Sequence, residues 1–417
     1  MDGISAGARV SDASITDGLV TEGLGAFDGI ICIGGEDWWY HNRGHFDFQI
    51  MRRLARDWPV LFVNSIGVRF PSAGHGAVFL ERILRKLKSF RQGLTLVENR
   101  FAVLSPLTVP GSAGQLASGW ALAPQIMLAA RYHGIRRPLL WVHCPPGVAL
   151  IDPLDPVATV LQRTDRFETF PEGDPVALGA AIAKLKRQAD LVVYCNDELR
   201  QSEAAEVKRS ALVTHGVELD RFVAAGLGAT PDPADMADLP RPRIGFIGGI
   251  DTHTFDPELF LAAAARLPEA TFAMIGGCSL PDGWCTLPNV RFLGRKPYDS
   301  IAAYMAACDA LIMPWNRSDW IKACNPIKLK EYLAVGRPVV TTDFPALAPY
   351  RHLVHVSGTG EGFADALRHA LAAGCDAEAQ RSAVATQSWD AKADQVKAAL
   401  LGLGVHYAGS TAAEAVA

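Results

Sequence analysis

Short apolar runs alternate with helix-like segments along the chain, and this alternation restricts the fold more than any other feature. Most runs are about four to eight residues long, rich in Val, Ile and Phe, and bounded by turn residues. They cover residues 29–35, 60–65, 94–104, 138–144, 157–161, 191–195, 211–216, 243–249, 271–277, 289–294, 310–315, 338–343 and 352–358. Helical patterns cover residues 46–58, 175–189, 257–267, 299–308 and 327–336. Because apolar strands separated by helices form parallel sheets covered on both faces, the sequence predicts a doubly wound α/β fold.

A proline-rich acidic stretch at residues 229–242 interrupts this pattern and is predicted to be an interdomain linker. It separates two α/β domains, which we place at residues 27–228 and 243–387. Residues 1–26 and 405–417 lack apolar periodicity and are predicted to be disordered tails. Two such domains would face each other across a cleft, and ligands of open parallel sheets bind beyond the carboxyl ends of the strands.

Composition excludes several classes of protein. With 40 Lys and Arg against 44 Asp and Glu, the formal net charge is −4, which argues against nucleic acid as a partner. No apolar run approaches the ~18 residues of a membrane-spanning helix, and the first residues lack the features of a signal peptide. The eight cysteines form no C-x2-C pair, so we expect free thiols in a reducing cytoplasm and no metal site.

The helix predicted at residues 327–336 has the features of an anion site. Asn325 and Pro326 suit its cap and first turn, and the first-turn amides would stabilise a diphosphate. Lys328 would add a full charge, and Glu331 lies three residues further on the same helix face. A carboxylate there could accept hydrogen bonds from two ribose hydroxyls. The alternative is an ordinary ion pair on a solvated helix.

Gly248 and Gly249 follow the first strand of the second domain and would let the backbone approach a ligand closely. The spacing of Gly245, Gly248 and Gly249 does not fit the dinucleotide fingerprint G-x-G-x-x-G. A tight turn between a strand and a helix explains these glycines equally well.

Several motifs, taken in order, carry a family resemblance. NVRFLGRKPYDSIAAYMAACDALIMPW followed by NPIKLKEYLAVGRPVVTT resembles the nucleotide-sugar-binding domain of glycosyltransferases with the GT-B fold. THGVELDRF and SWDAKADQVKAAL are similar to the segment that closes the first domain and to the C-terminal helix of family 4 enzymes. The resemblance implies an acceptor-binding domain at 27–228, a donor-binding domain at 243–387, and a helix at 388–404 that crosses back to the first domain.

The resemblance also assigns roles by position. Glu331 matches the ribose-binding glutamate, and the diphosphate site and the loop that holds the base follow from the same alignment of motifs. The residues that match the diphosphate site are Asn325, Pro326, Ile327 and Lys328. Those that match the loop for the base are Arg295, Lys296, Pro297 and Tyr298. Helix amides and Lys328 would replace a metal ion at the departing diphosphate, so we expect no cofactor beyond the sugar nucleotide itself.

The sequence departs from the family 4 pattern at two places. Ala323 stands where many family 4 enzymes carry the first glutamate of Glu-x7-Glu, and the usual Arg and Lys after the first strand of the second domain are absent. Both departures bring the chain closer to a teichuronic-acid or xanthan-type subset, which includes an inverting glucuronosyltransferase.

Inverting transfer requires a base that removes the proton of the acceptor hydroxyl. Asp165 is the first choice because it follows a strand, and Asp37, His45 and His143 are the runners-up near other strand ends. Each could instead be a capping Asp or a His satisfied within a loop. Trp38 and Trp39 could stack on a sugar or a lipid headgroup, or could form a hydrophobic plug.

The segment 77–90 combines an apolar face with a basic one, as surface helices on anionic membranes do. Its basic residues and the arginine just beyond it are Arg82, Arg85, Lys86, Lys88 and Arg91. It could equally pack on its own domain. We therefore expect a cytoplasmic, peripherally membrane-bound enzyme that transfers a sugar, from UDP rather than another nucleotide, to a lipid-linked or polysaccharide acceptor in exopolysaccharide biosynthesis.

Two alternatives remain at this point. A catalytically degenerate GT-B scaffold or a sugar- or nucleotide-binding protein would bind ligand without turnover. A sugar-nucleotide epimerase would convert the donor in the absence of any acceptor.

Overall fold

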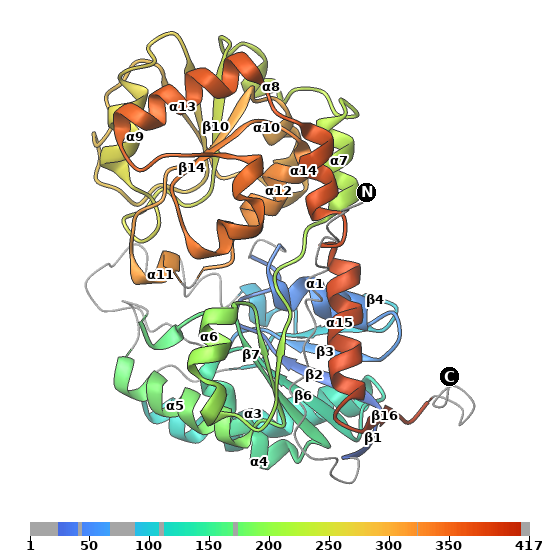
Figure 1. The fold of residues 1–417 in the computed structure, drawn as a ribbon. Helices are drawn as coiled ribbons and strands as arrows, with labels where there is room; N and C mark the ends of the chain where they lie inside the picture. Colours follow the sequence, from blue (N-terminus) through green and yellow to red (C-terminus); the bar gives the residue numbers. More distant parts are fainter. Residues whose placement is uncertain are drawn as a thin grey trace, which may run out of the picture. The chain divides into compact units, whose positions relative to one another are not determined.

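The computed structural model describes residues 24–40, 44–66, 88–107, 112–169, 174–322 and 324–409. The chain divides into a first unit, residues 1–214 with 392–417, and a second unit, residues 215–391. Each unit contains a largely parallel sheet with helices on both faces, as the alternating pattern predicts (Figure 1).

The sheet of the first unit has the strand order β4-β5-β3-β2-β6-β7-β8-β9. Its parallel strands are β2 (Gly29–Ile33), β3 (Val60–Val63), β5 (Phe101–Leu104), β6 (Pro138–Val142), β7 (Ala158–Arg163), β8 (Leu191–Tyr194) and β9 (Ser210–Leu212). The edge strand β4 (Leu94–Glu98) is antiparallel to β5. The run at 94–104 therefore forms a hairpin, because Asn99 and Arg100 turn the chain back between two apolar strands.

Helices cover both faces of this sheet. On one face, α1 (Phe46–Leu54) packs Phe48 against Trp38 and Phe62. On the other, the core includes residues of α3 (Ser112–Tyr132) and α5 (Pro175–Gln188). Shorter helical segments follow the strands: η1 (Pro145–Leu150), α4 (Ile151–Leu154), η2 (Phe167–Thr169), α6 (Asp197–Ser202) and η3 (Ala204–Glu206).

The second unit has a parallel sheet of order β12-β11-β10-β13-β14-β15. These strands are β10 (Arg243–Ile247), β11 (Thr271–Ile275), β12 (Val290–Gly294), β13 (Ala310–Met313), β14 (Val339–Thr341) and β15 (His355–Val356). One face packs on α7 (Leu219–Gly226), α10 (Ile301–Ala306), α12 (Ile327–Val335) and α14 (Ala377–Val384). The other packs on α9 (Pro257–Ala264) and α13 (Gly360–Ala373). Further helical segments of this unit are η4 (Tyr298–Ser300), α11 (Asp319–Lys322) and η5 (Pro345–Leu353).

Residues 229–242 differ from the predicted linker, because they are packed into the second unit. They contain α8 (Ala234–Ala237), whose Met236 is fully buried in the core of that unit. Asp232 pairs with Arg243 at 2.6 Å, and Asp235 pairs with Lys296 at 2.5 Å. The division between the units falls near Thr214 instead, so the proline-rich composition reflects an irregular but anchored connection.

The inner boundaries of both predicted tails lie closer to the ends of the chain than the sequence indicates. β1 (Gly25–Phe27) pairs in parallel with β16 (Val405–Tyr407), and Phe27 and Val405 are buried. Residues 1–23 and 410–417 lie outside the described residues. The helix predicted at 388–404 is α15 (Trp389–Leu401), which begins in the second unit and continues in the first. Among the described residues, no helix is long and apolar enough to cross a membrane.

Candidate functional site

A polar cluster lies at the carboxyl ends of β2, β6 and β7 in the first unit. His143 follows β6, and its Nδ1 lies 3.0 Å from Oδ2 of Asp47. Its Nε2 lies 3.2 Å from Oγ1 of Thr164, which follows β7. Oδ2 of Asp47 also accepts a hydrogen bond from the backbone N–H of Gly35 at 3.2 Å. The imidazole is therefore held from both sides.

Local structure explains why these groups meet. Asp47 lies in the first turn of α1, where the helix dipole stabilises a carboxylate, and its Oδ1 accepts from its neighbour Phe48 N–H at 2.9 Å. Gly35 follows β2, and a Cβ atom there would lie 2.6 Å from Nδ1 of His143. A glycine at this position lets the ring lie against the backbone.

The charges of the cluster are strongly coupled. Burial opposes the ionisation of Asp47, but His143, His45 and the Gly35 N–H outweigh it and lower the pKa of Asp47 to about 2. Burial likewise opposes the charged form of His143, yet its pKa is raised because Asp47, Asp165 and Glu36 surround the ring with negative charge. Asp47 is thus a carboxylate at neutral pH, and His143 is a readily protonated group beside it.

The structure places the four predicted candidates for the base in different roles. His143 is at the centre of the cluster. Asp165 and His45 act on it through charge, Asp165 directly and His45 through Asp47. Asp37 stabilises a turn, because its Oδ1 accepts from the Trp39 N–H at 2.9 Å. Asp47 was not among the residues predicted from the sequence; the available signal was one acidic residue between Phe46 and Phe48 on a helix with a buried face.

Trp38 does not face an acceptor. Its side chain is 1% exposed and packs against Phe48 and Phe101 at ring-centroid distances of 5.2 and 4.8 Å. The prediction of an acceptor contact is corrected for Trp38, which forms the hydrophobic plug. Trp39 is half-buried and donates from Nε1 to Oγ of Ser105 at 3.1 Å.

Most of the predicted basic membrane helix lies outside the described residues, including Arg82, Arg85 and Lys86. Lys88 and Arg91 are described and are exposed to solvent. Membrane contact by this segment stays a prediction.

In the second unit, Glu331 is the centre of the predicted donor site. It is fully buried on α12, so the prediction of a solvated surface pair is excluded. Its Oε1 accepts from the hydroxyl of Tyr298 at 3.1 Å, and its Oε2 accepts from Nζ of Lys328 at 2.8 Å. Burial and the Glu331 charge raise the pKa of Tyr298, which therefore stays a hydrogen-bond donor. Two other residues of the predicted donor site, Tyr298 and Lys328, thus converge on the Glu331 carboxylate.

The amino end of α12 differs slightly from expectation. Pro326 is the N-cap, with an extended backbone, and its side chain makes no capping hydrogen bond. Asn325 lies one residue before it and Ile327 opens the helix. The first-turn amides of this helix lie within one turn of Lys328, as the sequence predicts.

The loop after β12 is anchored rather than open. Lys296 pairs with Asp235 and lies 5.3 Å from the ring centre of Tyr304, which fixes the loop to α8. Pro297 caps η4, which carries Tyr298 into the core. That residues Arg295 to Tyr298 form the loop that holds the base stays a prediction, and in this structure the Lys296 side chain is engaged by Asp235.

The carboxyl ends of β10, β11 and β12 come together through close backbone packing. The Gly248 N–H donates to the Ile275 carbonyl at 3.0 Å, and a Cβ atom at Gly276 would lie 1.7 Å from the Gly248 oxygen. A Cβ atom at Gly277 would lie 2.6 Å from Nε of Arg295. Gly249 follows within the same turn, close to Asp251. Backbone packing thus requires a glycine at Gly276, whereas at Gly249 and Gly277 a Cβ atom would meet the ends of the Asp251 and Arg295 side chains.

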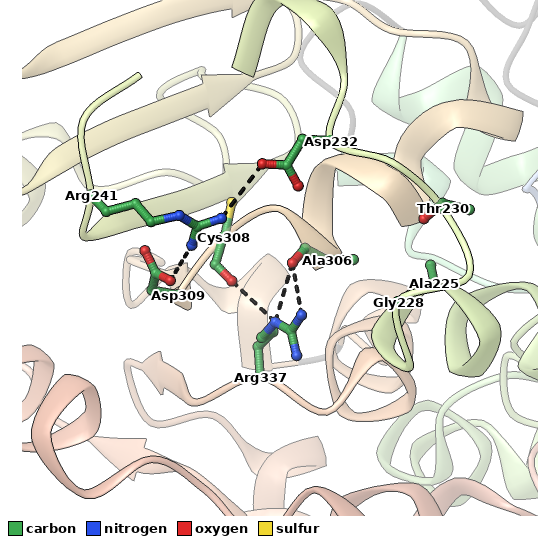
Figure 2. A pocket seen from close by; sticks show the side chains of 9 residues that line it. All are labelled: Ala225, Gly228, Thr230, Asp232, Arg241, Ala306, Cys308, Asp309 and Arg337. Carbon is green, nitrogen blue, oxygen red and sulfur yellow. Dashed lines mark hydrogen bonds and ion pairs between the residues drawn. The ribbon is translucent and has the colours of Figure 1, made fainter. Parts of the chain in front are cut away.

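The second unit contains a cavity of about 370 Å³ that is not the predicted site, and Figure 2 shows the residues that line it. Arg241, Asp309 and Arg337 line it, and they precede β10, β13 and β14. It therefore lies at the amino ends of the strands, whereas α12 follows the carboxyl end of β13. Arg337 donates to the Ala306 carbonyl at 2.9 Å and Arg241 pairs with Asp309, so both cations are engaged in structural contacts.

In the part of the chain that the structure describes, no three His, Cys, Asp or Glu side chains are grouped to hold a metal ion.

Comparison with solved structures defines the class of fold. Sucrose-phosphate synthase from Thermosynechococcus elongatus matches 90% of this chain and 99% of its own, with a TM-score of 0.66 and 15% identity. A trehalose-phosphate synthase from Burkholderia vietnamiensis matches 90% and 100%, with a TM-score of 0.62 and 15% identity. Alr3699/HepE of Anabaena, solved with UDP and glucose, matches 90% and 99%, with a TM-score of 0.61 and 15% identity. The protein has the GT-B fold.

Sequence comparison finds relatives for part of the chain. Residues 241–373, which lie within the second unit, match the family described as glycosyl transferases group 1. TuaH of Bacillus subtilis, described as a teichuronic acid biosynthesis glycosyltransferase, is 32% identical over 162 residues. That match spans 37% of this chain and 39% of TuaH. The predicted resemblance to family 4-like GT-B glycosyltransferases is confirmed.

Proposed function

We propose that the protein transfers a sugar from a nucleotide diphosphate, UDP in preference to others, to a hydroxyl of a lipid-linked or polysaccharide acceptor. The observation that carries this proposal is the buried Glu331 carboxylate, held by Tyr298 and Lys328 beside the amino end of α12. It lies in the domain that matches group 1 glycosyltransferases. The UDP in the HepE structure supports the donor class, and the likeness to TuaH supports the acceptor class.

The arrangement supplies recognition groups for the ribose and the diphosphate of the donor. A buried carboxylate with its position fixed by Tyr298 suits two vicinal ribose hydroxyls. Lys328 keeps 24% of its side chain exposed, so its flexible stem can move from Glu331 to the diphosphate. That movement frees Oε2 of Glu331 for a ribose hydroxyl. Helix amides and Lys328 then stabilise the departing diphosphate, and on this proposal no metal ion is required.

Replacement of Glu331 by glutamine should weaken UDP binding by about 10- to 100-fold, because hydrogen bonds to a charged group contribute about 1.5–3 kcal/mol. Calorimetry and thermal shift with UDP, GDP and ADP, in the presence of a chelator, measure the effect. Glu269→Gln is the matched control, because Glu269 is an exposed residue before β11 at the opposite end of the strands.

Three results would count against this proposal. UDP binding that is equal in wild type and Glu331→Gln would remove the donor site from α12. Binding of UDP without turnover of any UDP-sugar would favour the scaffold, and conversion of the donor without an acceptor would favour the epimerase. Peripheral attachment to an anionic inner leaflet remains part of the proposal, supported by the exposed Lys88 and Arg91.

A further inference from the structure

We propose that the exposed face of α3 in the first unit is a docking surface for an anionic lipid bilayer. The α3 surface, as we call it, consists of Leu107, Trp120, Pro124, Leu128 and Tyr132. The inference rests on the proposed function, because it assigns the surface through which the enzyme would reach a lipid-linked acceptor. It is separate from the basic segment 77–90, for which the sequence predicts membrane contact.

The helix α3 carries almost no charge for a helix at the surface of a domain. Its 21 residues include one charged side chain, Arg131, and no acidic residue. One face packs into the core of the unit, where Leu122, Ile126 and Ala129 are buried. The opposite face is exposed and is also apolar. Because surface helices normally present polar residues to solvent, an apolar solvent face indicates a surface that a partner covers.

The exposed apolar residues of α3 form a continuous stripe. Trp120, Pro124, Leu128 and Tyr132 recur every four residues, which places them along one side of the helix over about 18 Å. The exposed fractions of Trp120, Leu128 and Tyr132 are 83%, 72% and 85%. Side chains of this size, exposed together on one side, form a patch rather than scattered apolar contacts with water.

The chain before α3 widens this stripe. The Leu107 N–H donates to Oε1 of Gln125 at 2.9 Å, and Nε2 of Gln125 donates to the Leu107 carbonyl at 3.2 Å. These two hydrogen bonds hold the Leu107 backbone against α3, and the Leu107 side chain is exposed. The α3 surface is therefore broader than a single row of a helix, which suits a flat partner.

A second helix on the same face of the sheet shows the usual pattern. The helix α5 also packs into this core, and the exposed residues near its end include Lys184 and Arg187. The apolar solvent face is thus a property of α3 and not of every helix on this side of the unit.

Cations lie at the carboxyl end of the stripe. Arg131 is on α3, and Arg136 and Arg137 follow in the turn before β6; all three side chains are exposed. Within the described part of the chain, none of these guanidinium groups pairs with a carboxylate. Asp28 is the acidic residue beside them, and it accepts from the backbone N–H groups of Arg136 and Arg137 at 3.0 and 2.8 Å. Three cations thus stand against one carboxylate.

This chemistry fits a lipid surface better than a second copy of the chain. Trp and Tyr side chains suit the boundary between lipid and water, because their rings are apolar and their polar atoms can stay hydrated. Arginines next to an apolar surface attract anionic headgroups. A second copy would instead bring three more arginines to the interface, and α3 offers no carboxylate to pair with them.

Flotation of the full chain with vesicles tests the proposal. Vesicles of phosphatidylglycerol and phosphatidylcholine in equal parts are compared with vesicles of phosphatidylcholine alone. We expect the wild type to bind the anionic vesicles about tenfold more strongly in about 0.1 M NaCl, and the difference to shrink in about 0.5 M NaCl.

The apolar contribution is measured by substitutions on the stripe. Leu128→Ser should weaken binding to anionic vesicles by about tenfold, and Trp120→Ser with Leu128→Ser by about 100-fold, because less apolar surface enters the bilayer. Leu227→Ser is the matched control, because Leu227 is 68% exposed and lies in the second unit. It should bind as the wild type does. Since the replaced side chains are exposed, thermal unfolding should be unchanged in all three variants.

The contribution of charge is measured separately. Arg136→Gln with Arg137→Gln should weaken binding to anionic vesicles by about tenfold and leave binding to phosphatidylcholine unchanged. The matched control is Lys184→Gln with Arg187→Gln, which removes two exposed cations from α5. This control should bind anionic vesicles within about twofold of the wild type.

Insertion of Trp120 is tested directly by quenching with brominated lipids. Trp120→Phe should still bind vesicles, because phenylalanine also enters the boundary region. The wild type, which has nine tryptophans, should lose fluorescence on brominated vesicles, and Trp120→Phe should not. This comparison decides the proposal even if the double serine variant does not fold.

Several results would overturn the proposal. Vesicle binding of the double serine variant equal to that of wild type would assign attachment to the segment 77–90 instead. A dimer in analytical ultracentrifugation that Leu128→Ser dissociates would show that a second copy covers the stripe. Lower thermal stability of that variant with undiminished vesicle binding would show that another part of the chain covers it. Absence of UDP binding by the wild type contradicts only the proposed function, because vesicle binding is measured without a donor.

Discussion

Replacement of Glu203 by leucine should lower the free energy of unfolding of the first unit by about 3–5 kcal/mol, because it removes a buried carboxylate partner from the buried cations Arg163 and Lys186. Glu203 is 5% exposed. It accepts from Nη2 of Arg163 at 2.8 Å, from Tyr194 at 2.9 Å and from Lys186 at 3.2 Å. Arg163 is fully buried on β7, so its charge cannot be transferred to water.

The Glu203 network also connects several elements. It joins β7, β8 and α5, and Glu168 adds two further hydrogen bonds to Arg163 at 3.0 and 2.7 Å. Burial opposes the ionisation of Glu203, but Arg163 and Lys186 outweigh it and lower its pKa. The contribution of Glu203 to stability is therefore complete above about pH 4.5 and is lost as the pH falls through its lowered pKa.

Urea unfolding monitored by hydrogen exchange of β7 and β8 measures this change within the full chain. Glu198→Leu is the matched control, because Glu198 is 54% exposed and pairs with Arg166 at 3.1 Å. Removal of that exposed pair should cost less than about 1 kcal/mol. Equal effects of the two substitutions would show that the buried network does not stabilise the unit. The double variant Arg163→Met with Glu203→Leu should recover part of the lost free energy of unfolding, because it also removes the buried guanidinium that has lost its Glu203 partner.

Replacement of Gly226 by alanine should destabilise the second unit by about 3 kcal/mol, at the upper end of the usual cost of overpacking. Gly226 ends α7 where it meets the last residue of α12. A Cβ atom there would lie 1.9 Å from the carbonyl oxygen of Val335 and 2.8 Å from its carbon. Both contacts are with backbone, so no side chain can rotate away and the two helices must separate.

The sign of this effect is diagnostic. In an unobstructed helix, glycine-to-alanine replacement stabilises by about 0.5–1 kcal/mol. Gly179 in α5 provides the control, because a Cβ atom there would meet nothing within 4 Å. Thermal unfolding should show Gly179→Ala at or above wild type and Gly226→Ala well below it. A Gly226→Ala variant as stable as wild type would mean that α7 and α12 are not in backbone contact. Because α12 carries Lys328 and Glu331, UDP binding should also weaken in Gly226→Ala.

The elements that were predicted correctly depend on local patterns. The parallel strands follow from continuous apolar runs, and α12 follows from a proline at its start and a glycine, Gly336, at its end. Lys328 and Glu331 are three residues apart on that helix, so their contact needs only helical geometry. The burial of Glu331 did not follow, because Tyr298, which covers it, comes from a loop 33 positions earlier.

Other differences arise from contacts that are distant in sequence. Residues 229–242 have the composition of a linker, yet Met236 is buried in the second unit. Trp38 lies in a polar loop, yet it fills a space between Phe48, Phe62 and Phe101. In both cases composition describes the segment alone, whereas burial depends on which surface the rest of the chain presents to it.

The sequence by itself determined the alternation of strands and helices, the class of fold and the helix that carries the candidate donor site, because short-range backbone preferences and apolar periodicity encode them. Only the tertiary structure decided the pairing of Asp47 with His143, which are 96 positions apart. The strand order places β2 beside β6 and β6 beside β7, and thereby brings Gly35, His143 and Thr164 to one edge beneath the first turn of α1. Strand order depends on long-range packing free energy, which no local pattern records.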